Sequence, residues 1–344
     1  MAEITVRGAG IFGLSIAWAC VQRGARVHVI DPYGPGAGAS GGIVGALAPH
    51  VPENWNAKKA FQLDSLVQAE AFWQEVEEIG GRSAGYARMG RLQPIADDAA
   101  LELAFARELT ARQLWPGHVT WQVMDQQDAG PWAPPSPTGR LIKDTLTARI
   151  HPRLACAALV AALSAKGVTV QTGGTPRGET VWATGWQGLQ DMNRSHARSV
   201  GNGVKGQAVL LDHDARNQPQ LFIDGLHIVP HVDGTTAVGS TSERDFSDPA
   251  SVDAQCDVLL QRASAALPAL AVAPIRERWA GVRPRARSRA PMLGHWPDRP
   301  GHFIANGGFK IGFGMAPKIA QVMADLLIDG DNAIPPEFQV GASL

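Results

Sequence analysis

Three glycines near the N-terminus have the spacing of a turn that holds a phosphate group. Gly8, Gly10 and Gly13 follow a short apolar strand around Ile4 and open an apolar helix that ends near Gln22. In such a turn the first glycine allows the bend, the second lets the backbone approach a pyrophosphate, and the third lets helix and strand pack closely. Unpaired N–H groups at the helix N-terminus add attraction for an anion. The spacing predicts a dinucleotide-binding turn.

An acidic residue stands where a bound dinucleotide would present its ribose. Asp31 follows the second expected strand, residues 27–30, and its carboxylate can accept hydrogen bonds from ribose hydroxyls. The strand, glycine turn, helix, second strand and acid together form one βαβ unit, which is far more specific than three glycines alone. We expect Ile11, Phe12 and Pro32 to lie beside the same nucleotide.

Two other glycine-rich stretches could accommodate a large flat ligand. Residues 32–42 form a glycine-rich coil that runs directly into the small and apolar residues 43–49. Near the other end of the chain, residues 307–314 contain four glycines between a strand and a helix expected over residues 316–327. Small residues allow a backbone to approach a ligand closely, although a flexible surface loop has the same composition.

The overall composition is that of an ordinary globular protein. The chain has 344 residues, of which 45% are hydrophobic and 18% are charged, and its formal net charge is −1. This length suits two domains, and this charge gives no general attraction to nucleic acid or to an anionic membrane. Three isolated cysteines, Cys20, Cys156 and Cys256, fit a reducing compartment better than disulfides or a metal site. We therefore expect a cytoplasmic protein with no signal peptide, no membrane span and no bound metal.

Helices and strands alternate along the chain in an order that predicts an α/β protein. Apolar residues recur at helical spacing in residues 57–79, 98–113, 154–166 and 252–266. Short apolar strands are expected at residues 90–95, 121–124, 168–170, 180–186, 204–211, 221–223, 226–230 and 236–241. An Asp-Gly pair at residues 233 and 234 predicts a hairpin between the last two strands.

Several segments resemble the FAD-dependent amine oxidases of the D-amino-acid oxidase superfamily, the relatives of glycine oxidase and sarcosine oxidase. The resemblance begins with the βαβ unit and covers nearly the whole chain. The other matching segments are residues 39–49, His-Pro-Arg at 151–153, Ala-Thr-Gly-Trp at 183–186, the strand pair at 226–230 and 236–241, Trp-Ala-Gly-Val-Arg-Pro at 279–284, 290–294 and 303–317. One departure is that the chain between Val170 and Val181 is too short for the three-stranded crossover of the family, so no residue contacting the adenine is carried over.

The resemblance implies a Rossmann-like FAD-binding domain of the glutathione-reductase type, interleaved with an α+β substrate domain built on an antiparallel sheet. Residues 1–84, 141–202 and 281–344 would form the FAD-binding domain. Residues 85–140 and 203–280 would form the substrate-binding domain.

The resemblance also implies non-covalently bound FAD, because no Cys or His stands where relatives attach the flavin covalently. The helix expected from about residue 316 would direct its positive N-terminal end at the pyrimidine edge of the flavin. The residues expected to contact FAD are Gly8, Gly10, Ile11, Phe12, Gly13, Asp31, Pro32, Ala39, Ser40, Gly41, Gly42, Ala46, Leu47, Ala183, Thr184, Gly185, Trp186, Arg283, Gly307, Gly308, Phe309, Lys310, Ile311 and Gly312.

Three side chains are expected at the substrate. In the family, the arginine that matches Arg283 binds the substrate carboxylate, and a guanidinium suits this role because it can donate two parallel hydrogen bonds. His227 stands where glycine oxidase has a tyrosine that assists the carboxylate, although a lone histidine in a strand is often a core residue. Lys310 stands where that enzyme has a second arginine, and it could contact the carboxylate, favour dioxygen reduction or lie exposed on the surface. Most of the arginines between residues 276 and 289 would form a solvated basic edge.

The activity implied by the resemblance is FAD-dependent oxidation of a small amine or amino acid, with the electrons returned to dioxygen as peroxide. One alternative is a dehydrogenase that oxidises amino acids or 2-hydroxy acids and uses another electron acceptor. A second alternative is an FAD oxidoreductase that modifies a uridine of tRNA, and a third is a protein that binds FAD without catalysis. We expect a small-molecule substrate and no nucleic-acid partner, and the sequence leaves open whether the protein forms a homo-oligomer.

Overall fold

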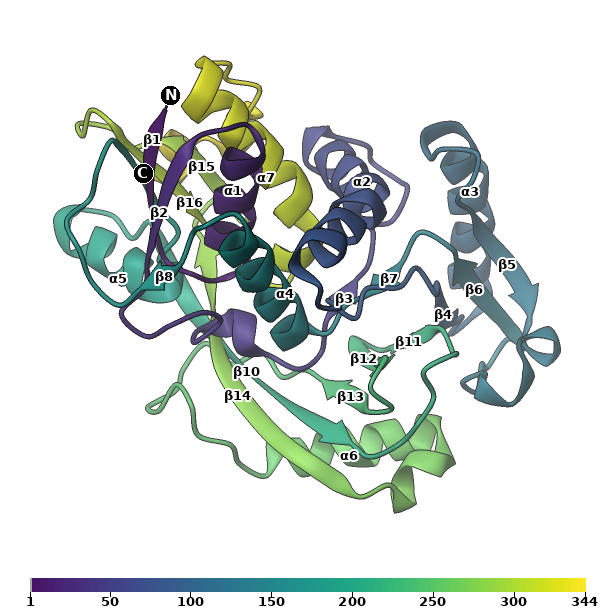
Figure 1. The fold of residues 1–344 in the computed structure, drawn as a ribbon. Coiled ribbons are helices and arrows are strands. Elements are labelled where there is room, and N and C mark those ends of the chain that lie inside the picture. Colours follow the sequence, from purple (N-terminus) through teal and green to yellow (C-terminus); the bar gives the residue numbers. More distant parts are fainter. Residues whose placement is uncertain (1) are drawn as a thin grey trace.

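The structure is a computed structural model that describes residues 2–344. Two large sheets organise it, as Figure 1 shows. The first sheet combines strands from both ends of the chain, purple and yellow-green in the figure, with two short strands from residues 170–182, and it is packed with helices. The second sheet is built mainly from the middle of the chain, and its longest strands run up to the first sheet.

Six strands form the first sheet, in the order β15-β16-β9-β1-β2-β8. Their bounds are Glu3–Arg7 for β1, Arg26–Ile30 for β2, Val170–Gln171 for β8, Glu179–Trp182 for β9, Met292–His295 for β15 and His302–Asn306 for β16. All neighbouring strands are parallel except β15 and β16. The carboxyl ends of β1 and β2 therefore meet at one edge of the sheet, where the glycine turn and Asp31 follow them.

Helices cover both faces of this sheet. The helices that pack on one another in the largest hydrophobic core, on one face, are α1 (Ile11–Gln22), α2 (Ala57–Gly80), α4 (Pro152–Ala165) and α7 (Gly312–Asp329). Helix α5 (Gly185–Ser195) lies on the other face, where its Leu189 packs with Met292 and Ile304. The strands are therefore buried on both faces, which explains why their sequences are continuous runs of apolar residues.

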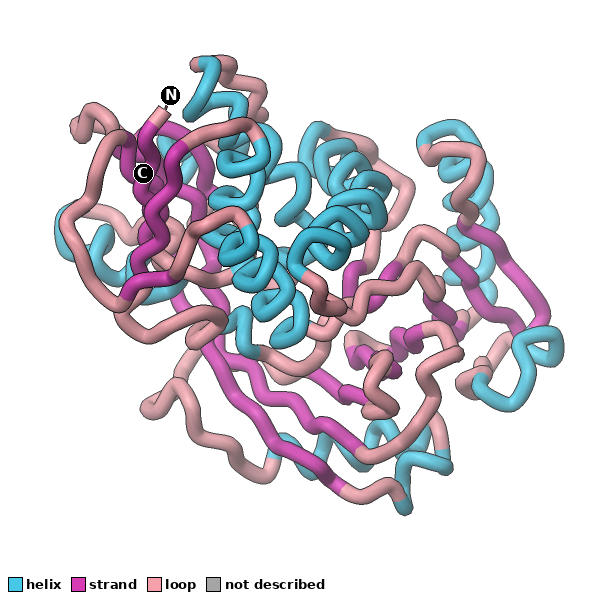
Figure 2. Tube along the Cα trace, viewed as in Figure 1, coloured by secondary structure: helices cyan, strands magenta, loops and turns pink. Residues whose placement is uncertain are grey.

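Eight strands form the second sheet, in the order β14-β10-β13-β12-β11-β4-β6-β5. Its two longest strands are the long magenta segments in the lower half of Figure 2. Their bounds are Ile275–Ala286 for β14, Gly201–Leu211 for β10, Thr236–Gly239 for β13, Leu226–Pro230 for β12, Gln220–Ile223 for β11, Arg91–Pro94 for β4, Arg140–Asp144 for β6 and Trp121–Asp125 for β5. Neighbouring strands are antiparallel except β11 and β4, which pair in parallel. The expected hairpin at residues 233 and 234 connects β12 and β13.

The remaining elements cover the second sheet or connect it to the first. Helix α6 (Gln255–Ala266) packs on one face of the second sheet, and α3 (Asp98–Leu114) packs beside β5. The two-residue strands β3 (Ala46–Leu47) and β7 (Ala148–Arg149) pair with each other as a small separate sheet. Residues 39–41, which carry part of the predicted ligand contact, form a short 3₁₀ turn.

The predicted combination of a parallel sheet and an antiparallel sheet is confirmed, and three elements differ from expectation. Sequence patterns do not predict α5, whose two glycines are poor helix formers, and the strand expected to reach residue 186 ends at Trp182. They also do not predict β14, because its closely spaced arginines hide the strand alternation. Helix α7 begins at Gly312, four residues before the expected start, so two glycines of the predicted turn lie inside its first turn.

The division of the chain into two domains stays a prediction. Most strands fall on the predicted side of each boundary, but three strands of the second sheet span one: β6 at residue 141, β10 at residue 203 and β14 at residue 281. A division by sheets alone would therefore move these three boundaries to residues 145, 201 and 287.

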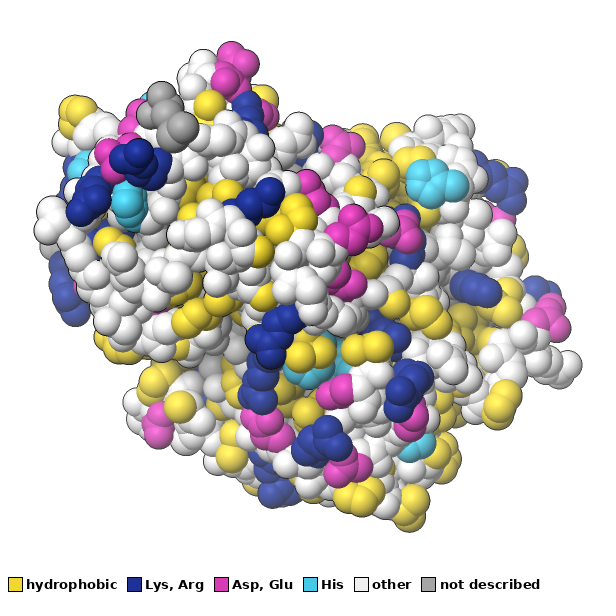
Figure 3. Space-filling model, in the orientation of Figure 1, with side chains coloured by type: hydrophobic (Ala, Val, Ile, Leu, Met, Phe, Trp, Pro, Cys, Tyr) yellow, Lys and Arg dark blue, Asp and Glu magenta, His cyan; other side chains and the backbone are white. Residues whose placement is uncertain are grey.

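All three cysteines are free thiols. No helix within residues 2–344 is long and apolar enough to cross a bilayer, and no cluster of His, Cys, Asp and Glu side chains in this range suits a metal ion. Cys20, Cys156 and Cys256 lie in helices as expected and are buried and unbonded. On the face in Figure 3, basic and acidic side chains are interspersed rather than gathered in a patch of one sign.

Candidate active site

The opening turn between β1 and α1 has room only for glycine at two of its three positions. Gly8 adopts φ +108°, and a Cβ atom there would come closer than 3.0 Å to the carbonyl oxygen of Ala183. A Cβ atom at Gly13 would come equally close to the carbonyl of Gly8. The first and third glycines therefore serve the bend and the close packing of helix on strand that the spacing predicts.

At the N-terminus of α1, few side chains bond to the exposed backbone N–H groups. Its N-cap is Gly10, which provides no side-chain cap, and the N–H of Ile11 donates to Ser40 Oγ at 2.9 Å. Ser40 thus fixes residues 39–41 across the turn, although these residues are far from it in sequence. Free N–H groups at a helix N-terminus form a site for a phosphate.

Asp31 is held at the same turn. Its Oδ2 accepts a hydrogen bond from the N–H of Ala9 at 2.7 Å, and its Oδ1 accepts one from the N–H of Tyr33 at 2.9 Å. These two bonds orient the carboxylate at the carboxyl end of β2, beside the glycine turn. A second lone pair on each oxygen remains for a hydroxyl donor.

The closing turn, residues 307–312, lies against the opening turn. A Cβ atom at Gly308 would lie 2.7 Å from Cζ of Phe12, and one at Gly312 would lie 3.7 Å from Cγ2 of Ile11. Helix α7 begins here, with no side-chain cap at Ile311. Two turns that are almost 300 residues apart in sequence therefore meet, and with them meet the N-termini of α1 and α7, whose N-cap residues provide no side-chain cap.

One face of the second sheet forms the opposite wall. His227 pairs with Gly239, Gly239 with Ala208, and Ala208 with Trp279, so these four residues share that face. Alternation along β14 places Arg283 on the same face as Trp279. Ile43 and Val44 pack on the small residues of this face, so the segment after the 3₁₀ turn lies between the opening turn and the second sheet.

Arg283 is anchored on this wall and almost fully buried, with 9% of its surface exposed. Its Nη1 donates to the carbonyl oxygen of Thr241 at 3.2 Å, and its Nη2 donates to Ser240 Oγ at 2.7 Å. Burial lowers the pKa of Arg283 to about 10, and the nearby negative charge of Glu243 opposes this change. The guanidinium therefore stays charged at neutral pH and keeps N–H groups free for a ligand.

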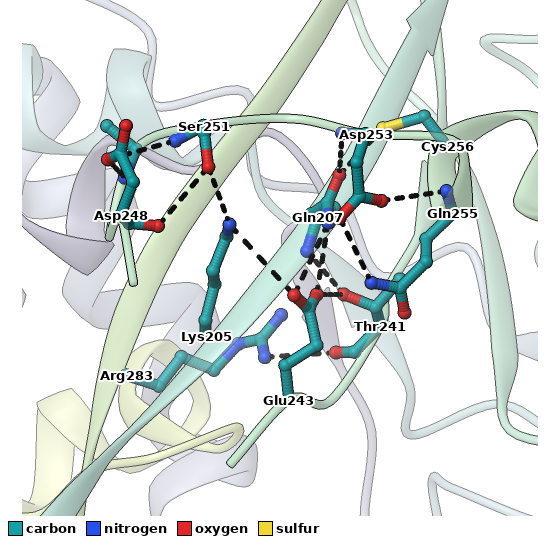
Figure 4. A network of polar contacts seen from close by, with 11 residues as sticks. Lys205, Gln207, Thr241, Glu243, Asp248, Ser251, Asp253, Gln255, Cys256 and Arg283 are labelled. Atoms are coloured by element: carbon teal, nitrogen blue, oxygen red, sulfur yellow. Dashed lines mark hydrogen bonds and ion pairs between the residues drawn. The ribbon is translucent and has the colours of Figure 1, made fainter. Parts of the chain in front are cut away.

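A buried polar network supports the anchor of Arg283 (Figure 4). The hydroxyl of Thr241 accepts from the N–H of Gln207 at 2.7 Å and donates to the carboxylate of Glu243. The Gln207 amide also donates to Glu243, at 3.3 Å, and Lys205 Nζ lies 4.0 Å from the same carboxylate. Glu243 therefore interacts both with the ammonium group of Lys205 and with Thr241, whose carbonyl oxygen binds Arg283.

His227 and Lys310 face the same region as Arg283. Burial lowers the pKa of His227 to about 3, and the positive charges of Arg91 and Lys310 lower it further in the same direction, so the imidazole is neutral at physiological pH. Its Nδ1 has no hydrogen-bond partner. Partial burial, followed by the charges of Arg283 and Arg285, lowers the pKa of Lys310. The charge of Lys310 therefore acts on His227, and the charge of Arg283 acts on Lys310.

The structure brings most of the predicted site residues together, but not all of them. Ala183 and Thr184 lie against Gly8, whereas Trp186 points away and packs its ring on Phe246 at 6.3 Å between ring centroids. The predictions for individual contact residues stay predictions. Sequence patterns do not indicate the residues that position Arg283, namely Gly206, Gln207, Ser240, Thr241 and Glu243. The one available signal is Gly206 itself, because a glycine inside a strand often marks a close approach.

Comparison with known proteins assigns this arrangement to a family. Residues 3–326 match the family described as FAD dependent oxidoreductase. The chain belongs to this family. It is 25% identical over 365 residues to the bifunctional protein ThiO/ThiG of Nostoc sp., covering 95% of this chain and 53% of that protein, so the chain spans about half the length of this relative.

Glycine oxidase of Geobacillus kaustophilus is a relative of similar length. It is 25% identical over 364 residues, which cover 94% of this chain and 92% of the relative. The solved structure of that enzyme superposes with a TM-score of 0.85 and 20% identity and covers 99% of both chains. The chain therefore has the same fold as that glycine oxidase, a Rossmann-like sheet with an antiparallel second sheet.

FAD is the cofactor of the FAD-dependent oxidoreductase family, and the described residues fit it. The opening turn and the N-terminus of α1 suit the pyrophosphate, since both leave backbone N–H groups in close reach. Asp31 at the end of β2 suits the ribose. The N-terminus of α7 suits the flavin edge that gains negative charge on reduction.

Proposed function

We propose that this FAD-dependent oxidoreductase oxidises a small amine or amino acid at its α-carbon. Arg283 carries the proposal. Its guanidinium is buried, it forms no ion pair with a carboxylate of residues 2–344, and only two of its N–H groups are used by Thr241 and Ser240. A buried, charged and partly unbonded guanidinium suits a ligand carboxylate. The names of the relatives, glycine oxidase and ThiO, support a glycine-like substrate.

The residues of the chain would position the substrate for hydride loss. Arg283 binds the carboxylate, and neutral His227 donates one hydrogen bond beside it. Non-covalent FAD supplies the two-electron acceptor. A hydride leaves the α-carbon and a proton leaves the nitrogen, and water then hydrolyses the imine to a carbonyl compound and an amine or ammonia. Dioxygen, or another acceptor, finally takes up two electrons and two protons.

The proposal is tested by anaerobic titration of the flavin-loaded protein. Glycine, sarcosine, D-amino acids and 2-hydroxyglutarate are added in turn, and the flavin absorbance is followed. We expect bleaching by at least one amine. Bleaching by 2-hydroxyglutarate alone would replace the proposal with hydroxy-acid oxidation, and no bleaching by any compound would contradict an oxidising function. A peroxide assay beside a dye-acceptor assay then separates dioxygen from other acceptors.

The arginine-rich strand gives no support to a tRNA substrate. Arg276 pairs with Asp212 at 2.6 Å, and Arg278 pairs with Asp257 at 2.5 Å, so two of its exposed charges are neutralised. Binding to nucleic acid depends on free cations that contact phosphates. We therefore propose a small-molecule substrate.

A further inference from the structure

Two cations beside Arg283 have no counter-ion among residues 2–344. Arg285 and Lys310 form no ion pair with any carboxylate in this range, although Arg276 and Arg278 on the same strand are both paired. Glu243 is the one acid whose charge acts on Arg283, and it lies beneath it in the polar network. The face that receives the substrate therefore carries more positive charge than one carboxylate can neutralise.

Arg285 and Lys310 lie beside one aromatic ring, and Arg285 shares a sheet face with Arg283. Arg283 and Arg285 are two residues apart on β14, so their side chains leave the same face of the sheet. The guanidinium carbon of Arg285 lies 5.3 Å from the ring centre of Phe309, and Nζ of Lys310 lies 5.8 Å from the same centre. The N–H of Phe309 donates to the carbonyl oxygen of Pro284 at 2.9 Å, which ties the closing turn to β14 between the two arginines.

The three charges repel one another. The positive charges of Arg283 and Arg285 both lower the pKa of Lys310. Like charges held close together in a partly buried site favour binding of an anion, because the anion relieves their repulsion. One substrate carboxylate on Arg283 leaves Arg285 and Lys310 without a partner.

We propose that the substrate carries a second carboxylate, which Arg285 and Lys310 bind beside the first carboxylate on Arg283. This inference rests on the proposed function and narrows its substrate to an amino dicarboxylate. The two cations stand on different elements, β14 and the closing turn, and thus define a subsite at the junction of the two sheets.

Binding is tested first, with ligands that cannot be oxidised. The oxidised, flavin-loaded protein is titrated with acetate and malonate, and with propionate and succinate, while the flavin spectrum is followed. The members of each pair differ by one carboxylate. We expect the dicarboxylate of at least one pair to bind about 10-fold or more tightly than its monocarboxylate, as for a close charge pair in a desolvated site. Equal binding within both pairs would overturn the inference.

Reduction is tested next with sarcosine and iminodiacetate, which are achiral and differ only by one carboxylate on the N-methyl group. We expect iminodiacetate to reduce the flavin at about 10-fold lower concentration. Faster reduction by sarcosine at equal concentration would overturn the inference while leaving the proposed function intact. If neither these compounds nor the wider panel reduce the flavin, the proposed function fails, and the binding titration still decides whether the second subsite exists.

Substitutions of single residues test whether Arg285 and Lys310 bind the second carboxylate. Arg285→Gln and Lys310→Gln should each remove most of the preference for the dicarboxylate, and Arg276→Gln, which removes a paired charge from the same strand, should preserve it. FAD content, measured from the absorbance ratio, should stay unchanged in Arg285→Gln and Arg276→Gln, and it is measured in Lys310→Gln as well because Lys310 is also expected to contact FAD. Loss of FAD in Arg285→Gln or Lys310→Gln with an unchanged preference would overturn the inference, because the cations would then serve the cofactor.

Discussion

The guanidinium of Arg283 lies directly against the Cα atom of Gly206. A Cβ atom at residue 206 would come closer than 3.0 Å to Cζ, Nη1 and Nη2 of Arg283. The two residues lie on neighbouring strands, where Gly206 pairs with Gly281 and Arg283 pairs with Val204. The absence of a side chain at Gly206 thus creates the space in which the arginine can lie across β10 and reach Ser240 and Thr241.

Gly206→Ala should therefore weaken carboxylate binding without unfolding the protein. The methyl group would displace the guanidinium from its two hydrogen bonds, and hydrogen bonds to a charged group contribute about 1.5–3 kcal/mol. We expect the Kd for a carboxylate ligand to rise at least about 10-fold. Spectral titration of the flavin measures this change. Gly117→Ala, where no atom lies within 4 Å, is the control, and an unchanged Kd in Gly206→Ala would disprove the packing argument.

Ser40→Ala should weaken FAD binding. The substitution leaves the N–H of Ile11 without its side-chain acceptor and releases residues 39–41 from the opening turn. Loss of such a capping bond costs about 1 kcal/mol. We expect a rise of about 5-fold in the Kd of FAD, measured by fluorescence quenching during reconstitution of the apoprotein. Ser195→Ala, which removes a hydroxyl at the end of α5, should leave FAD affinity unchanged.

Glu243→Gln should destabilise the protein through Lys205. The Lys205 side chain is only 4% exposed, and Ser251 would be its remaining hydrogen-bond partner. An unpaired buried charge costs about 3 kcal/mol. Urea denaturation should show this loss, and the double variant with Lys205→Met should recover part of it. Because Thr241 also loses a charged partner, we expect KM to rise while kcat is retained, and a fall in kcat alone would exclude a positioning role.

His231 should make the protein sensitive to acid. Its imidazole is fully buried, with Nε2 2.8 Å from the carbonyl oxygen of Ile43, and burial lowers its pKa from 6.5 to about 4. Below pH 6.5 the unfolded chain gains a proton that the folded protein does not accept. The contribution of neutral His231 to the free energy of unfolding is therefore complete above pH 6.5. It is lost as pH falls toward 4, by at most about 1.4 kcal/mol per pH unit.

His231→Gln tests this pH dependence. Its free energy of unfolding, measured in urea between pH 4 and 7.5, should vary less with pH than that of the wild type. We also expect a loss of about 1 kcal/mol at pH 7 from the weakened bond to Ile43. His118→Gln, at an exposed position, should follow the wild-type curve. Parallel curves for His231→Gln and the wild type would rule out His231 as the source.

The nucleotide-binding half of the site can be predicted from the sequence. Gly8, Gly13 and Asp31 belong to one continuous βαβ unit, in which the spacing of residues along the chain fixes their separation in space. Arg283 was identified through the motif around it. By contrast, α5 was missed because packing of Leu189 against the far face of the sheet outweighs its two glycines, and no local pattern records that packing.

The sequence by itself determined that a dinucleotide turn opens the chain, that an acid follows it and that small residues recur where a flat ligand would lie, because each of these depends on neighbours in the chain. Tertiary structure alone decided that Gly308 meets Phe12, that Gly206 makes room for Arg283, and that Arg285 and Lys310 converge on Phe309. These relationships depend on strand register and on which segments pair across the sheets. Register is set by the packing of whole faces, and a shift of one residue would turn Arg283 to the opposite side of the sheet.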